Sequence, residues 1–139
     1  MNYKTIDERD NELIAKAKAK IEDTFEEKHH RLVTAVLTEE GNTYYGINLQ
    51  LDRIRRASAC SDSGAISNAV LNKEKPILIV AVRKPAAVEP NQETKVVNPC
   101  GLCREMLTDY YPDINVIVTT PEGIKKCTAI ELMPLKYGM

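Results

Sequence analysis

An unbroken apolar run at residues 77–82 is the longest in this 139-residue chain and indicates the fold class. A strand-length run without polar alternation is typical of a strand covered on both faces, which requires helices on both sides of the sheet. Further strand patterns occupy residues 32–37, 43–49, 114–118 and 124–128, and helical patterns occupy residues 10–28, 58–72, 101–110 and 129–132. This order predicts a layered α/β domain with a mixed five-stranded sheet.

Capping residues and prolines mark the ends of these elements. Asp10 or Asn11 is the expected N-cap of the first helix, and Ser58 that of the second. Pro76 is expected to stop the second helix and Pro112 the third. The loop at residues 83–98 is long for a compact domain, which is typical of a functional loop. The apolar face of the first helix comprises Ile14, Ala17, Ile21 and Phe25.

Composition restricts the class of protein. The chain carries 19 Lys and Arg against 20 Asp and Glu, so it lacks the basic excess of a nucleic-acid-binding protein. No apolar stretch approaches the roughly 18 residues of a membrane span, and the N-terminal segment lacks the apolar core of a secretory signal. We therefore expect one cytoplasmic domain over residues 1–139, with no nucleic-acid or membrane partner. Thiols stay reduced in the cytosol, so clustered cysteines there indicate a metal site or catalysis.

The cysteine cluster is the sharpest local motif. Pro99 precedes Cys100 and Cys103, which lie one turn apart where a helix is expected to begin. Such thiolates are stabilised by the positive end of the helix and can bind one soft metal ion. Cys60 lies near the start of another helix and is the natural third ligand. Three protein ligands leave an open position on Zn²⁺, as in catalytic zinc sites.

Asp62 follows two residues after Cys60 and offers a carboxylate for proton transfer. Positions i and i+2 do not share a helix face, so the two side chains can meet only if the metal lies beyond the helix tip. The alternative is that Asp62 is a solvent-facing acid in the first helical turn.

The two motifs together resemble the zinc deaminases, whose pattern is His or Cys, any residue, Glu, and later Pro-Cys-x-x-Cys. Cys60-Ser61-Asp62 and Pro99-Cys100-Gly101-Leu102-Cys103 match it in order. The resemblance is to the cytidine deaminase family, including its blasticidin-S deaminase relatives, and it extends over nearly the whole chain. It implies a three-layer α-β-α fold, a homotetramer (or homodimer), and a small-molecule nucleoside substrate. It also implies that zinc is held by Cys60, Cys100 and Cys103.

The resemblance implies that a zinc-activated water attacks C4 of a cytosine ring while Asp62 protonates N3. Asn48 corresponds to a ribose-contacting asparagine of the family, and Gln50 stands where the family has a ribose-binding glutamate. His30 stands where the family has a phenylalanine before the first strand. Asp62 itself replaces a glutamate, and Ser63 replaces an arginine that often follows the first motif. These departures keep open a zinc-bound protein that is catalytically silent or repurposed, or a deaminase of a non-nucleoside ring.

Other interpretations of these residues remain open at this stage. The three cysteines are alternatively buried hydrophobes, a thioredoxin-like redox pair, or a structural zinc site completed by His29 or His30. Asn48 is alternatively a turn residue at a strand end, and Gln50 a surface residue. Candidates for offsetting the charge of three thiolates on zinc are Arg55, Arg56, Arg104 and the helix N-termini.

Overall fold

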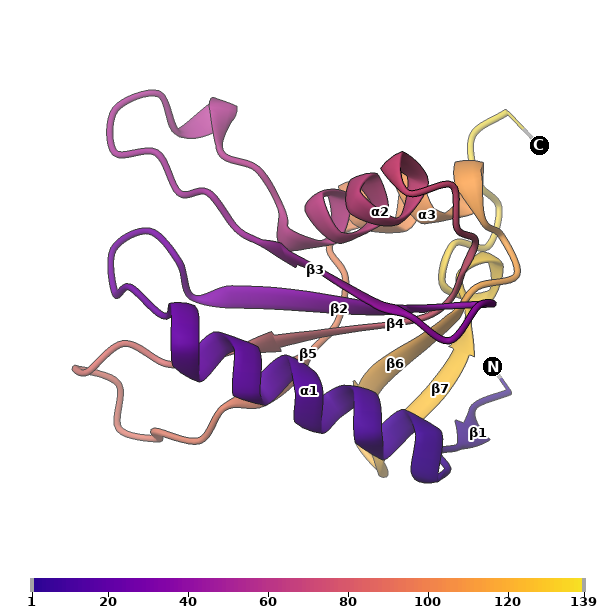
Figure 1. Ribbon diagram of the computed structural model, residues 1–139, viewed down its shortest axis with the longest axis horizontal. Coiled ribbons are helices and arrows are strands. Elements are labelled where there is room, and N and C mark those ends of the chain that lie inside the picture. Colours follow the sequence, from indigo (N-terminus) through magenta and orange to yellow (C-terminus); the bar gives the residue numbers. More distant parts are fainter. Residues whose placement is uncertain (1, 139) are drawn as a thin grey trace.

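The computed structural model describes residues 2–138 (Figure 1). In chain order, its elements are β1 (Lys4–Thr5), α1 (Glu8–Thr24), β2 (Leu32–Thr38), β3 (Thr43–Ile47), the 3₁₀ helix η1 (Arg55–Ala57), α2 (Ser61–Leu71), β4 (Pro76–Arg83), β5 (Lys95–Val97), α3 (Gly101–Tyr110), β6 (Asn115–Thr120), β7 (Gly123–Thr128) and the 3₁₀ helix η2 (Ile130–Leu132). None of the helices within residues 2–138 is both long and apolar enough to cross a membrane.

The strands form one mixed sheet. Its order is β1-β7-β6-β4-β2-β3, and β5 pairs with β4 outside this path. β4 runs parallel to β6 and antiparallel to β2. Figure 1 shows α1 on one face of the sheet and α2 with α3 on the other, which confirms the predicted α-β-α layers. The predicted number of five strands is corrected to seven, because β1 and β5 are too short to show a two-residue alternation.

Two apolar cores lie on the two faces of the sheet. Along β4, Leu78 and Val80 pack in the core beneath α1, while Ile79 packs in the core beneath α2 and α3. β2 alternates in the same way, with Ala35 on the α1 side and Val36 on the α2 side. Burial on both faces explains why residues 77–82 contain no polar residue.

The helix boundaries differ from the sequence predictions, and α1 ends at Thr24 and not at residue 28, so that Phe25 is its C-cap and not part of its apolar face. α1 begins after Asp7, not after Asp10 or Asn11, because Asp7 and Asp10 each accept a hydrogen bond from the backbone N–H of the other in a capping box. α2 begins at Ser61, three residues after the predicted start, and its N-cap is Cys60 and not Ser58. Pro76 begins β4 and does not stop α2, which ends at Leu71.

Candidate metal and catalytic site

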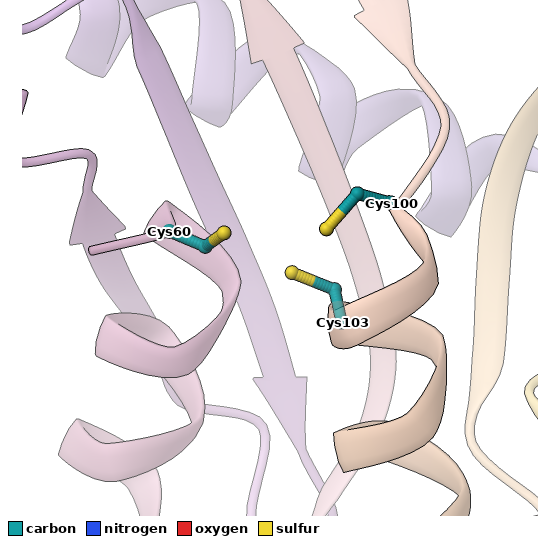
Figure 2. Close-up of side chains that lie close together, drawn as sticks. All are labelled: Cys60, Cys100 and Cys103. Carbon is teal, nitrogen blue, oxygen red and sulfur yellow. The ribbon is translucent and has the colours of Figure 1, made fainter. Parts of the chain in front are cut away.

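Three cysteine side chains from two distant segments converge at one end of the sheet. Cys60 is the N-cap of α2 and Cys100 is the N-cap of α3, and Cys103 lies in the first turn of α3. Figure 2 shows the three sulfur atoms pointing toward one another, and all lie within 4.8 Å of each other. The N-termini of both helices therefore face the cluster with their unpaired N–H groups and positive dipole ends.

This donor set fits a zinc ion. Tetrahedral zinc with Zn–S bonds of about 2.3 Å holds its sulfur ligands about 3.8 Å apart, so a small contraction of the cluster suffices. All four cysteines are free thiols, and Cys127 is buried outside the cluster. Within residues 2–138, no histidine or acidic group joins the three sulfurs as a fourth ligand. The three sulfurs could therefore hold a metal ion and leave one coordination position open.

The three thiols differ in their surroundings. Burial raises the pKa of Cys60 and that of Cys103 above the ordinary thiol value. Burial also acts to raise the pKa of Cys100, but hydrogen bonds from the N–H groups of Cys103 and Leu102 and from neighbouring thiols reverse this and lower it. The first turn of α3 thus favours a thiolate at Cys100, the form that binds metal.

His29 and His30 are both engaged elsewhere. The His29 ring lies 2.7 Å from a Glu26 carboxylate oxygen and 3.2 Å from one of Asp52. The Nδ1 atom of His30 lies 3.0 Å from the carbonyl oxygen of Asn48. Neither histidine is a member of the sulfur cluster, which removes the structural zinc site that either would have completed.

Asp62 lies beside the cluster and is only 5% exposed. Its Oδ1 atom accepts a hydrogen bond of 2.5 Å from the Thr34 hydroxyl, which also lies 2.7 Å from Ser61 Oγ. Burial raises the pKa of Asp62, and the hydrogen bonds from Thr34 and Cys103 oppose this shift. A solvent-facing acid in the first helical turn is therefore not what the structure contains.

A pocket of about 300 Å³ opens over this site. All three cysteines and Asp62 line it, as do Asn48 and Gln50 from the segment after β3. Its other lining residues are Leu32, Leu49, Ser58, Ala59, Ser61, Ala81, Val97, Asn98 and Pro99. The pocket thus combines an apolar wall with a few polar groups near the sulfurs, as small-molecule sites do.

The residues expected to contact substrate lie at different depths. Asn48 is buried, and its Oδ1 accepts hydrogen bonds from the backbone N–H groups of Arg31 and Leu32, at 2.8 and 2.9 Å. Gln50 is half-buried on the pocket wall. His30 is not among the lining residues, but its Nδ1 atom contacts the carbonyl oxygen of Asn48, which is one of them.

The arginines considered for charge compensation do not line the pocket. Arg104 donates from Nε to the carbonyl oxygen of Pro99 at 2.9 Å, and from a terminal nitrogen to that of Leu132 at 3.4 Å. Arg55 and Arg56 are exposed in η1. The groups that face Cys100 are therefore amides at the α3 N-terminus, one of the candidates that the sequence left open.

The sequence analysis missed the buried residues Thr34, whose hydroxyl donates to Asp62, and Ser61, whose hydroxyl contacts that of Thr34. A signal was available for Thr34, because it is a polar residue inside the otherwise apolar strand segment at residues 32–37. Buried polar groups are costly unless they are hydrogen-bonded, so such a residue predicts a partner. The partner itself depends on how α2 lies across the sheet.

Comparisons with known proteins agree with this geometry. No protein-family model matches the chain. The blasticidin-S deaminase of Bacillus cereus is 37% identical over 133 residues, covering 95% of this chain and 94% of that protein. The crystal structure of cytidine deaminase from Bacillus anthracis gives a TM-score of 0.74 at 23% identity, covering 93% of this chain and 89% of that one.

A second cytidine deaminase structure, from Burkholderia pseudomallei, gives a TM-score of 0.70 at 21% identity and covers 91% of this chain and 98% of that one. Because these two solved structures are less than 25% identical to this chain, they establish the fold alone. The match to the Bacillus cereus protein extends over both cysteine motifs and nearly all of each chain, and it establishes the family. This chain belongs to the cytidine deaminase-like family of hydrolases, together with blasticidin-S deaminase.

Proposed function

We propose that this chain catalyses zinc-dependent hydrolytic deamination of a cytosine-type nucleoside, giving the uracil form and ammonia. Cytidine, deoxycytidine and the analogue blasticidin S are the candidate substrates. The observation that carries the proposal is the convergence of three Sγ atoms in a pocket that also contains the buried carboxylate of Asp62. The names of the related proteins, which refer to deamination of cytidine and of blasticidin S, support the same reaction.

Cys60, Cys100 and Cys103 would hold the metal ion. When bound, zinc supplies a Lewis acid that makes a water molecule nucleophilic near neutral pH. The two helix N-termini and the amides at Cys100 offset the negative charge of the thiolates. The first turn of α3 favours the thiolate form at Cys100, whereas burial raises the pKa of Cys60 and Cys103, so bound metal would favour their deprotonation.

Asp62 moves the protons of the reaction. Its carboxylate accepts a proton from the attacking water and delivers it to N3 of the ring as the C4–oxygen bond forms. The second proton of that water passes through the same carboxylate to the amino group, which leaves C4 as ammonia. One water is consumed and one ammonia released, and Asp62 returns to its starting state.

Asn48 and Gln50 would bind the part of the substrate beyond the ring. Both lone pairs of Asn48 Oδ1 are engaged by the N–H groups of Arg31 and Leu32, so Asn48 meets a ligand through its Nδ2 donor. Such a donor suits a sugar hydroxyl oxygen. Gln50 offers a neutral amide in place of a carboxylate, and His30 acts indirectly by contacting the Asn48 carbonyl.

A second candidate function is a metal-bound relative without turnover. The observation that favours it is the short Asp62 side chain, which is drawn toward the sheet by Thr34. A misplacement of about 1 Å can cost on the order of 100-fold in rate. This alternative predicts a normal metal content and no ammonia from any cytosine compound.

We also propose that the chain acts as a homotetramer, or a homodimer, in the cytoplasm. Free thiols suit a reducing compartment. An apolar patch on the outer face of α2 and α3, which includes Val70 and Tyr110, supports self-association. Sedimentation equilibrium would test the assembly, and a monomer at all concentrations would contradict it.

The function is tested by incubating the purified, zinc-loaded chain with cytidine, deoxycytidine, blasticidin S and free cytosine. Loss of the cytosine absorbance and ammonia release are measured together. We expect one ammonia for each ring converted with at least one nucleoside. Turnover of free cytosine alone would show a non-nucleoside substrate, and no ammonia from any compound would favour the silent relative.

A further inference from the structure

Thr34 is the third residue of β2 and lies on the face toward α2, where its side chain is fully buried. Its neighbour on the same face, Val36, is part of the apolar core. A hydroxyl in this position would cost free energy without a partner, and here it contacts two polar groups of α2. Neither contact follows from the cysteine motifs.

When Asp62 is ionised, it can only accept hydrogen bonds, and this sets the direction of the two hydroxyl contacts. Thr34 has a single hydroxyl hydrogen, which it donates to Asp62 Oδ1 at 2.5 Å. The 2.7 Å contact with Ser61 Oγ must then use the Ser61 hydrogen as donor. The order is Ser61 to Thr34 to Asp62, so Thr34 is a stronger donor to the carboxylate than an isolated hydroxyl would be.

The backbone brings α2 close enough for this contact. Gly46 in β3 is the register partner of Thr34 in β2. A Cβ atom at Gly46 would lie 2.2 Å from the Ser61 carbonyl oxygen and 2.2 Å from the Ala65 nitrogen. The first turn of α2 therefore rests directly on the sheet beside Thr34, and the short Asp62 side chain can reach it.

We propose that Thr34 is a positioning residue for the deamination, because it fixes Oδ1 of Asp62 and thereby orients the other carboxylate oxygen for proton transfer in the pocket. This inference rests on the proposed function. Thr34 does not line the pocket, so it acts through Asp62 and not on the substrate. It holds the Asp62 carboxylate in one orientation.

The test compares Thr34→Val, which removes only the hydroxyl, with Thr34→Ser, which keeps it. Thr38→Val is the matched control, because Thr38 lies on the same strand, is 1% exposed, and donates to the Glu74 carboxylate at 2.6 Å. We expect Thr34→Val to lower kcat for the best nucleoside about 10- to 100-fold with KM changed less than about threefold. Thr34→Ser should retain most of kcat.

Thr38→Val should lower the unfolding temperature without changing kcat. Zinc content and unfolding temperature are measured for each variant, and Thr34→Ala replaces Thr34→Val if that variant does not fold. The inference is overturned if Thr34→Val keeps the wild-type kcat, if its loss of kcat follows loss of zinc, or if Thr38→Val loses kcat equally. A wild-type chain without turnover overturns the proposed function first, and an active wild type with an unaffected Thr34→Val overturns the inference alone.

Discussion

β2 buries a threonine hydroxyl against a carboxylate near each of its ends, and the two pairs differ in what surrounds them. Glu74 accepts hydrogen bonds from Thr38, Asn42 and Tyr44, and these bonds lower its pKa. Asp62 is buried, which raises its pKa, and it has fewer donors. A carboxylate with several hydrogen-bond donors is held ionised and stabilises the fold, whereas a buried carboxylate with fewer donors takes up a proton more readily.

The two ends of the sheet also differ in which ends of α2 and α3 lie there. α2 and α3 both begin at the end where Cys60 and Cys100 converge, as Figures 1 and 2 show. Their N–H groups face the cluster, so anionic sulfur is favoured there. The Glu74 end of β2 lies near the end of α2 and carries no cysteine of the cluster. The candidate site thus lies at one end of β2, and the hydrogen-bonded Glu74 carboxylate lies at the other.

The largest expected effect comes from neutralising one carboxylate of each pair. Asp62→Asn keeps the side-chain shape but cannot carry a proton, so we expect kcat for the best nucleoside to fall about 1000-fold. Glu74→Gln is its partner variant and should leave kcat within about twofold, because Glu74 does not line the pocket. Steady-state kinetics on both variants measure this. A fall in kcat of less than about tenfold for Asp62→Asn would show that Asp62, like Glu74, is not required for proton transfer.

A smaller effect is expected from separating α2 from the sheet. Gly46→Ala places a methyl group 2.2 Å from helix backbone atoms, and we expect a loss of about 3 kcal/mol in the free energy of unfolding. Gly101→Ala is the matched control, because its added Cβ meets nothing within 4 Å. Urea denaturation measures both. Equal stability of the two variants would contradict the close packing at Gly46.

The smallest effect concerns acid stability at the Glu74 end of β2. The folded pKa of Glu74 lies below its ordinary value of 4.5, because Thr38, Tyr44 and Asn42 donate hydrogen bonds to the carboxylate. Its stabilising contribution is therefore complete above that value and is lost as the pH falls through the lower folded pKa. The difference in unfolding temperature between wild type and Glu74→Gln should shrink on acidification below 4.5. A difference that grows in acid would contradict this assignment.

Much of the candidate site was predictable because each motif carries its own local geometry. Cys100 and Cys103 lie one helical turn apart wherever a helix begins after Cys100. Cys60 followed from the same reasoning applied to α2, although the cap was misplaced to Ser58. The apolar run of β4, which has no polar alternation, likewise predicted helices on both faces of the sheet.

What could not be predicted depends on contacts between elements. The hydrogen bond from Thr34 to Asp62 requires the register of β2 against β3 and the close approach of α2 to Gly46. No local sequence pattern predicts either of these. β1 and β5 are too short for periodicity. The roles of Asn48 and His30 in holding the first hairpin also became visible only when β3 was seen beside residues 30–32.

The most direct test of the metal site is the metal content of the purified chain, measured by mass spectrometry beside a Cys60→Ser variant. Three converging thiols with one open coordination position predict about one zinc per wild-type chain. The variant should lose most of it, and its unfolding temperature should fall toward that of chelator-treated wild type. A wild-type chain that holds no transition metal, even after incubation with zinc, would contradict the account.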